Sequence, residues 1–144
     1  MRIYVAGVVP RDSLGEWLLI PLLQLYGELE QIAAERKIEV LIPRVNPDLE
    51  SMHPEEFVKV LKDEIIKSDG VLTVFHPPTV AVGFEAHFAS TVGKPQAIVL
   101  SKSWLPPRFL VALPCIIGIY VIEDQNLQQI VSNLLAAIQH RVCV

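Results

Sequence analysis

The sequence has few charged side chains and no excess of positive charge. Charged residues make up 19% of its 144 positions, and 12 Lys and Arg against 16 Asp and Glu give a formal net charge of −4. Binding to a nucleic acid polymer relies on clustered basic side chains, so this charge balance argues against a polynucleotide partner. A small anion stays compatible with the sequence, because backbone amides at a helix start can bind one.

Long hydrophobic runs are also missing. A membrane-spanning helix needs ~20 apolar residues, and no stretch of that kind occurs, so we expect no membrane segment. Hydrophobic residues nevertheless make up 51% of the chain, which excludes an intrinsically disordered protein. The length predicts one domain covering residues 1–144.

Cysteine is scarce as well. Cys115 lies in an apolar run and Cys143 near the C-terminus, and we expect both to be reduced thiols in a cytoplasmic protein. His53 and His140 have no partners at the spacing of metal ligands, and no phosphate-binding P-loop is present. We therefore expect neither a metal ion nor an organic cofactor.

What the sequence does contain is a regular alternation of short apolar runs and helical patterns. Continuous apolar runs are typical of strands buried on both faces, and their alternation with helices predicts an α/β three-layer sandwich around a parallel sheet. We predict five strands in the order 2-1-3-4-5, a flavodoxin-like or Rossmann-like arrangement. The strands are expected at residues 2–6, 38–42, 71–75, 96–100 and 116–122, and the helices at residues 14–37, 54–68, 83–92, 108–113 and 126–141.

Prolines and glycines set the expected ends of several helices. Pro21 would kink a helix interior, so the first helix is expected to begin near Ile20. Pro54 suits the first position of a helix, and Gly93 is expected to end another. Residues 44–53 are expected to form a polar loop.

This topology predicts where a ligand binds. In open α/β sheets ligands bind beyond the carboxyl ends of the strands, where the strand order reverses. Here that point lies between the first and third strands, and residues 7–13 and 76–83 line it. Glu85 follows in the first turn of the predicted helix, where the helix dipole would keep its carboxylate ionised and suited to act as a nucleophile.

Three segments carry a family resemblance. Residues 2–7 read Arg-Ile-Tyr-Val-Ala-Gly, residues 68–71 read Ser-Asp-Gly-Val, and residues 83–89 read Gly-Phe-Glu-Ala-His-Phe-Ala before Gly-Lys-Pro. Together they resemble the nucleoside 2-deoxyribosyltransferase superfamily. The resemblance is strongest to its 2′-deoxynucleoside 5′-monophosphate N-glycosidase branch, which reads Pro-Ser-Leu-Gly-Val-Gly-Tyr-Glu at the place of residues 78–85.

The resemblance implies an enzyme that cleaves or transfers the N-glycosidic bond of a 2′-deoxynucleoside or its 5′-monophosphate. Glu85 would attack C1′ of the sugar, the base would leave, and water or a second base would resolve the covalent intermediate, as in retaining glycosidic chemistry. The implied partner is a small-molecule nucleoside or nucleotide, and the implied assembly is a homodimer or higher homo-oligomer. Trp17 and Trp104 are expected to take part in packing and in contacts between the subunits, because large apolar surface patches mark interfaces.

Further residues are candidates for substrate binding. Tyr4 matches a family tyrosine at the end of the first strand, and it would form a wall of the site together with Phe84. Thr79 matches a family serine that binds the 5′-group, and its hydroxyl would form a phosphate cradle with the amides of residues 81–83, including Gly83. The remaining candidates are Gly7, which would let its loop approach the ligand, Arg11, one position from a family arginine, and His76, which ends the third strand within reach of the ligand.

The chain departs from the family at several positions: Ala81 replaces a glycine, Val111 stands near the place of a phosphate-binding serine, residues 8–10 replace a Gly-Ser-rich loop start, and one carboxylate of the site is missing. The family has an aspartate eight residues before its strand-3 aspartate, and Leu61 stands there in this sequence. Glu64 lies on the same helix face but one turn, ~5 Å, further from the site. Asp12, Glu55 and Glu56 are the carboxylates expected to be able to replace the missing one, and the sequence does not choose among them.

Two other functions remain open. A nucleotide-binding module that keeps Glu85 but has lost the second carboxylate would bind without cleaving. A flavodoxin-like or receiver-type signalling domain is disfavoured, because the first strand is not followed by the acidic pair that binds Mg²⁺ or by a loop rich in Ser and Thr that binds flavin phosphate.

Overall fold

The computed structural model describes residues 1–104 and 108–140. Five parallel strands form one sheet in the order β2-β1-β3-β4-β5, which confirms the predicted topology. The elements are β1 (Arg2–Ala6), η1 (Asp12–Leu14), α1 (Glu16–Arg36), β2 (Glu39–Leu41), α2 (Pro47–Glu50), α3 (Pro54–Lys67), β3 (Gly70–Phe75), α4 (Val80–Thr91), β4 (Gln96–Leu100), α5 (Arg108–Val111), β5 (Ile116–Val121) and α6 (Leu127–Gln139).

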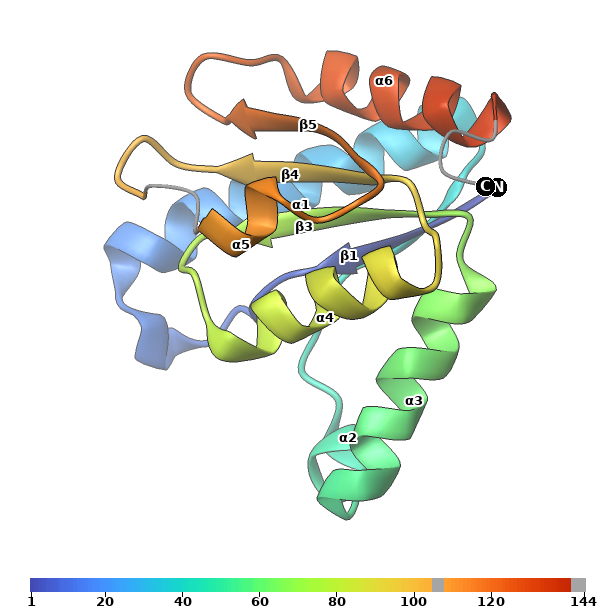
Figure 1. The fold of residues 1–144 in the computed structure, drawn as a ribbon. Helices are drawn as coiled ribbons and strands as arrows, with labels where there is room; N and C mark the ends of the chain where they lie inside the picture. Colours follow the sequence, from blue (N-terminus) through green and yellow to red (C-terminus); the bar gives the residue numbers. More distant parts are fainter. Residues whose placement is uncertain (105–107, 141–144) are drawn as a thin grey trace.

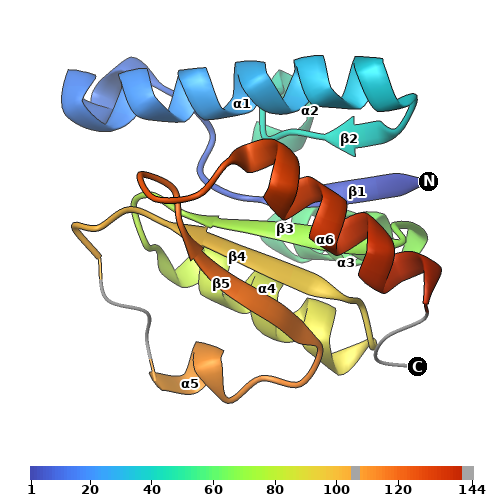
Figure 2. The same cartoon turned by 90° about the horizontal axis from the view of Figure 1, so that it is seen from above.

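Helices cover both faces of the sheet. Helices α1 and α6 lie on one face, and α3, α4 and α5 lie on the other, as Figures 1 and 2 show from two directions. The largest core cluster joins α1 and α6 to the sheet, and two smaller clusters join α3, α4 and α5 to the opposite face. Within the described residues, no helix has the length and apolar character needed to cross a membrane.

Helix α1 begins earlier than predicted. It starts at Glu16, after Gly15 at φ 78°, and Pro21 lies within it. The proline removes one backbone hydrogen bond to the carbonyl of Trp17, but that residue is 65% exposed, so water can hydrate the carbonyl. The cost is therefore small enough for the helix to continue through Pro21.

The expected polar loop contains a short helix, α2. The side chain of Asn46 accepts a hydrogen bond of 3.0 Å from the amide of Asp48, and Pro47 occupies the first helical position. Both features favour a helix start, which the pattern of apolar residues did not reveal because α2 buries none of its side chains.

The expectation of two reduced cysteines is wrong for Cys115, which is disulfide-bonded. Cys143 lies outside the described residues. The cytoplasmic location therefore loses the support that reduced cysteines would have given it.

Candidate active site

Glu85 is positioned by the cap of α4. The side chain of Thr79 accepts a hydrogen bond of 3.2 Å from the amide of Val82, so the helix begins at Val80 rather than at residue 83 as predicted. Glu85 is consequently in the second turn of α4, and it is only 6% exposed. Its place relative to the sheet therefore depends on how α4 packs.

A buried polar network fixes α4 on the sheet. Gln96 of β4, which is fully buried, donates a hydrogen bond of 3.1 Å to the carbonyl of Ala86 and accepts one from Thr73 of β3. Ser90 of the same helix donates a hydrogen bond of 2.7 Å to the carbonyl of Pro114. Because buried polar groups are costly unless they are paired, this network holds α4, and with it Glu85, in one position.

Tyr4 is the direct partner of Glu85. Its hydroxyl donates a hydrogen bond of 2.8 Å to Oε2 of Glu85, and both side chains are buried. The two residues are distant in sequence, but β1 pairs with β3, and α4 follows β3 and packs back against β1. One carboxylate oxygen is thus held by Tyr4.

The electrostatics of Glu85 differ from the expectation. Burial raises the pKa of Glu85 to about 7, and the hydrogen bond from Tyr4 only partly opposes that rise. The prediction of a carboxylate kept ionised by the helix start is therefore wrong: the dipole acts mainly within the first turn, and desolvation dominates in the second. Burial and the nearby Glu85 also raise the pKa of Tyr4, which keeps its hydroxyl protonated as a donor.

Glu85 faces a pocket of about 350 Å³ on the side of the sheet that carries α3 and α4. The pocket is formed by the ends of β1 and β2, the chain that follows each of them, and one face of α3. Most of its lining is apolar. Its lining residues are Tyr4, Val5, Gly7, Val9, Leu41, Ile42, Pro43, Arg44, Asn46, Leu49, Phe57, Val60, Leu61, Glu64 and Glu85.

The second carboxylate of the pocket is Glu64. Leu61, the position at which the resemblance calls for an aspartate, also lines the pocket, and Glu64 lies one turn further along α3. Glu64 forms an ion pair with Arg2 and a longer one, 3.8 Å, with Lys67. The three carboxylates considered as replacements, Asp12, Glu55 and Glu56, are exposed and are not among the residues that line this pocket.

Arg44 is a site residue that the sequence did not indicate. It follows β2 at the same edge of the sheet, lines the pocket of Glu85, and pairs with Glu30 of α1 at the surface. No other Lys or Arg is among the described residues that line the pocket. The signal that could have found it is its position directly after a predicted strand, at the edge where ligands bind.

The structure separates the remaining candidates. Gly7 lines the pocket of Glu85, whereas Thr79 and Gly83 line a different, apolar pocket of about 560 Å³, together with Phe84. Two of the amides expected to cradle a phosphate are engaged within the helix: that of Val82 donates to the Thr79 hydroxyl, and that of Gly83 donates to the Thr79 carbonyl.

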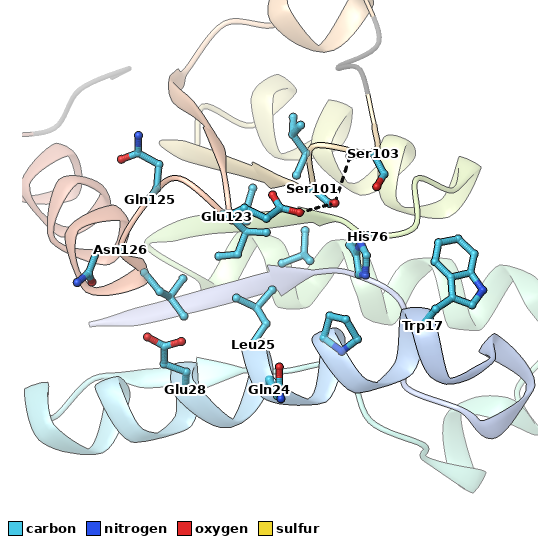
Figure 3. A pocket seen from close by; sticks show the side chains of 16 residues that line it. Trp17, Gln24, Leu25, Glu28, His76, Ser101, Ser103, Glu123, Gln125 and Asn126 are labelled. Atoms are coloured by element: carbon cyan, nitrogen blue, oxygen red, sulfur yellow. Dashed lines mark hydrogen bonds between the residues drawn. The ribbon is translucent and has the colours of Figure 1, made fainter.

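Two candidates lie away from Glu85. Arg11 forms an exposed ion pair with Glu50 and is not among the residues that line the pocket of Glu85. His76 lines a third pocket, on the other face of the sheet (Figure 3). The physical reason is strand alternation: successive side chains of an extended segment point to opposite faces, so His76 shares the side of Val74, while Phe75 packs near α4.

The pocket of Glu85 has the properties of a site for acid–base or nucleophilic chemistry. A carboxyl group whose pKa is near 7 is present in both protonation states at neutral pH, and its free oxygen Oε1 has no hydrogen-bond partner among the described residues. The apolar walls exclude water and strengthen electrostatic interactions inside.

Comparison with known proteins identifies the fold. No protein-family model matches the sequence, and no curated protein is significantly similar to it. Among solved structures, the CMP N-glycosidase BcmB of Clostridium botulinum is similar over 92% of this chain and 98% of its own, with a TM-score of 0.65 and 17% identity. This similarity shows the fold: the chain has the same three-layer α/β architecture as that protein, the architecture that the sequence predicted.

Proposed function

We propose that the protein cleaves the N-glycosidic bond of a nucleoside or nucleotide, with Glu85 as the nucleophile. The observation that carries this proposal is the buried carboxylate of Glu85, held by Tyr4 and facing a largely apolar pocket at the carboxyl edge of the sheet. The fold shared with a CMP N-glycosidase and the sequence resemblance around Glu85 support the same reaction class.

The proposed reaction proceeds in two steps. Oε1 of ionised Glu85 forms a bond to C1′ of the sugar while the C1′–N bond breaks, and the electron pair of that bond goes to the base nitrogen, which takes a proton from water. Water then attacks C1′, releasing the sugar and restoring the carboxylate; a second base in place of water gives transfer. The hydrogen bond from Tyr4 keeps Oε2 in place during both steps.

A 5′-phosphate would meet one cation in this pocket. Glu64 and Glu85 both repel an anion, and Arg44 is the cationic side chain available at the rim. Its ion pair with Glu30 is exposed, and exposed pairs of this kind contribute little, about 0–1 kcal/mol. We therefore propose that Arg44 leaves Glu30 to bind the phosphate of a nucleotide substrate.

The test is release of free base from dGMP, dCMP, CMP and the matching nucleosides, followed by chromatography. Glu85→Gln keeps the shape of the side chain and an acceptor for Tyr4 but removes the nucleophile, so it should abolish release. Glu35→Gln, on the exposed face of α1, is the matched control and should leave the rate unchanged. Mass spectrometry of the quenched reaction should find the sugar on the peptide that contains Glu85.

Binding without cleavage is the competing function. It is favoured by one observation: Leu61 provides no carboxylate, and Glu64 is engaged by Arg2. Calorimetry that detects nucleotide binding, together with no base release by the wild-type protein from any of these substrates, would assign the protein to that class instead.

We also propose assembly into a homo-oligomer through α4 and α5. Val80 is 91% exposed, and Phe84, Phe109 and Val111 are exposed on the same two helices. Exposed apolar patches of this kind mark contact surfaces. Sedimentation of the wild-type protein should show a dimer or larger species, and Val111→Glu should shift it towards the monomer.

A further inference from the structure

A pocket larger than the one that contains Glu85 lies on the opposite face of the sheet. It has a volume of about 590 Å³ and is found at the carboxyl ends of β3, β4 and β5 (Figure 3). Helix α1 forms one wall, and the segments that follow β4 and β5 form the other. In open α/β sheets this edge is where ligands bind, and nothing in the proposed reaction uses this pocket.

The charged side chains that line this pocket are all negative. Glu28 enters from α1 and Glu123 from the opposite wall, and none of the described lining residues is Lys or Arg. The nearby Lys102 is directed to Asp124, with Nζ 2.9 Å from its carboxylate. The pocket therefore presents negative charge that no lining cation neutralises.

Glu123 is held as a carboxylate by its hydrogen bonds. Ser101 donates from its hydroxyl at 2.7 Å to one oxygen, and the amide of Lys102 donates at 3.0 Å to the other. Desolvation raises the pKa of Glu123, but these hydrogen bonds outweigh it, so the pKa lies below its ordinary value. Glu123 is accordingly ionised at neutral pH and positioned by the turn that follows β4.

His76 supplies an unused acceptor. Both of its ring nitrogens are buried, and neither has a hydrogen-bond partner among the described residues. Burial lowers the pKa of His76, with Glu123 opposing that effect, so the ring is neutral and one nitrogen can accept a hydrogen bond. Buried polar atoms usually have partners, and an unpaired one beside a cavity points to a group that binds there.

The floor of the pocket is apolar. Leu25 of α1, Val74 of β3 and Val99 of β4 contribute aliphatic side chains, and Trp17 borders the pocket at one end (Figure 3). Small-molecule sites commonly combine such an apolar surface with a few placed polar groups. Here the polar groups include two carboxylates and a neutral imidazole, which together favour a ligand that donates hydrogen bonds or carries positive charge.

We propose that this pocket is a second ligand site, which binds a small organic amine with an apolar or aromatic body. The amine nitrogen interacts with Glu28 and Glu123 and reaches the free nitrogen of His76, while the body rests on the aliphatic floor. The site is on the other face of the sheet from Glu85, so the proposal does not depend on the N-glycosidase activity.

Three probes with the same ring and different charge test it. Benzylamine is a cation, benzyl alcohol is neutral and benzoate is an anion. Added to the ¹⁵N-labelled full-length protein, benzylamine should shift the amide signals of residues 76, 101 and 123 with a Kd of about 1 mM, typical of a fragment-sized ligand. Benzyl alcohol should bind more weakly, and benzoate should leave these signals unchanged.

Two substitutions assign the binding to the carboxylates. Glu28→Gln and Glu123→Gln should each weaken benzylamine binding by about threefold, the value of a partly exposed ion pair, whereas Glu35→Gln on the same helix as Glu28 should not. Glu28 is exposed, so the Glu28→Gln variant should fold normally. It therefore tests the proposal even if Glu123→Gln alters the local structure by weakening the contact with Ser101. The proposal is overturned if benzylamine shifts none of the three signals, if benzoate binds as well as benzylamine, or if Glu28→Gln binds like the wild-type protein.

Discussion

The hydroxyl of Tyr4 lies 2.8 Å from Oε2 of Glu85, and it donates a hydrogen bond to that oxygen. The bond joins the first strand to the helix after the third, across the point where the strand order reverses. It opposes the effect of burial, which raises the pKa of Glu85 to about 7. Tyr4 thereby increases the ionised fraction of the carboxylate on which the proposed reaction depends.

Tyr4→Phe should therefore change the pH dependence of base release. Without the hydrogen bond the pKa of Glu85 rises further, so the acidic limb of the rate profile moves to higher pH. Hydrogen bonds to charged groups contribute about 1.5–3 kcal/mol, which predicts a loss of roughly ten- to a hundredfold near neutral pH and a smaller loss in more alkaline solution. A rate profile with an unchanged acidic limb would contradict this role.

Glu85→Gln should stabilise the fold, and more so at alkaline pH. The folded-state pKa of Glu85, about 7, lies above its ordinary value of 4.5, so the native state binds the proton more tightly than the unfolded chain. The contribution of Glu85 to the free energy of unfolding is then fully present below about pH 4.5. This contribution falls by about 3 kcal/mol as pH rises through 7. Urea unfolding of both proteins at about pH 5 and pH 8 measures the difference, which should be small at the lower pH and large at the higher one.

Gly7→Ala should destabilise the protein through Tyr26. A Cβ at position 7 would lie 2.3 Å from the hydroxyl oxygen of Tyr26, which donates a hydrogen bond of 2.9 Å to the carbonyl of Val8. Overpacking of this kind costs about 1–3 kcal/mol. Tyr26→Phe removes the hydroxyl, so the double variant has no clash. Its loss in the free energy of unfolding should therefore be smaller than the sum of the losses in the two single variants. A loss equal to that sum would show that the hydroxyl is not the obstacle.

Leu61→Asp should increase base release. It places a carboxylate in the pocket of Glu85, at the position at which the resembled family carries one. General acid–base groups commonly contribute a hundredfold or more, and we expect a rise of about tenfold, because the side chain enters an otherwise unadapted pocket. Leu61→Asn has the same size without the charge and should give no rise. Equal rates for the two variants would show that the missing carboxylate does not limit the reaction.

The sequence by itself determined the architecture and the residue most suited to chemistry. Apolar runs such as residues 71–75 and 96–100 are local signals, because a strand buried on both faces is largely apolar, and the two polar residues in these runs, Thr73 and Gln96, pair with each other. Glu85 was found from its motif and from the rule that places ligands at the switch point. The start of α4 was predicted three residues too late, since the capping hydrogen bond at Thr79 begins the helix at Val80 rather than at Gly83.

Only the tertiary structure decided which candidates meet and how they are charged. His76 and Glu85 follow the same strand, but side-chain alternation sends the histidine to the α1 face and the packing of α4 turns the glutamate to the other. The pKa of Glu85 depends on desolvation by residues far away in the chain, which no local pattern encodes. Glu64 and Arg44 line the same pocket as Glu85 because β1 pairs with both β2 and β3, which brings these segments together. Pairing between distant segments is a property of the folded chain and not of any local pattern.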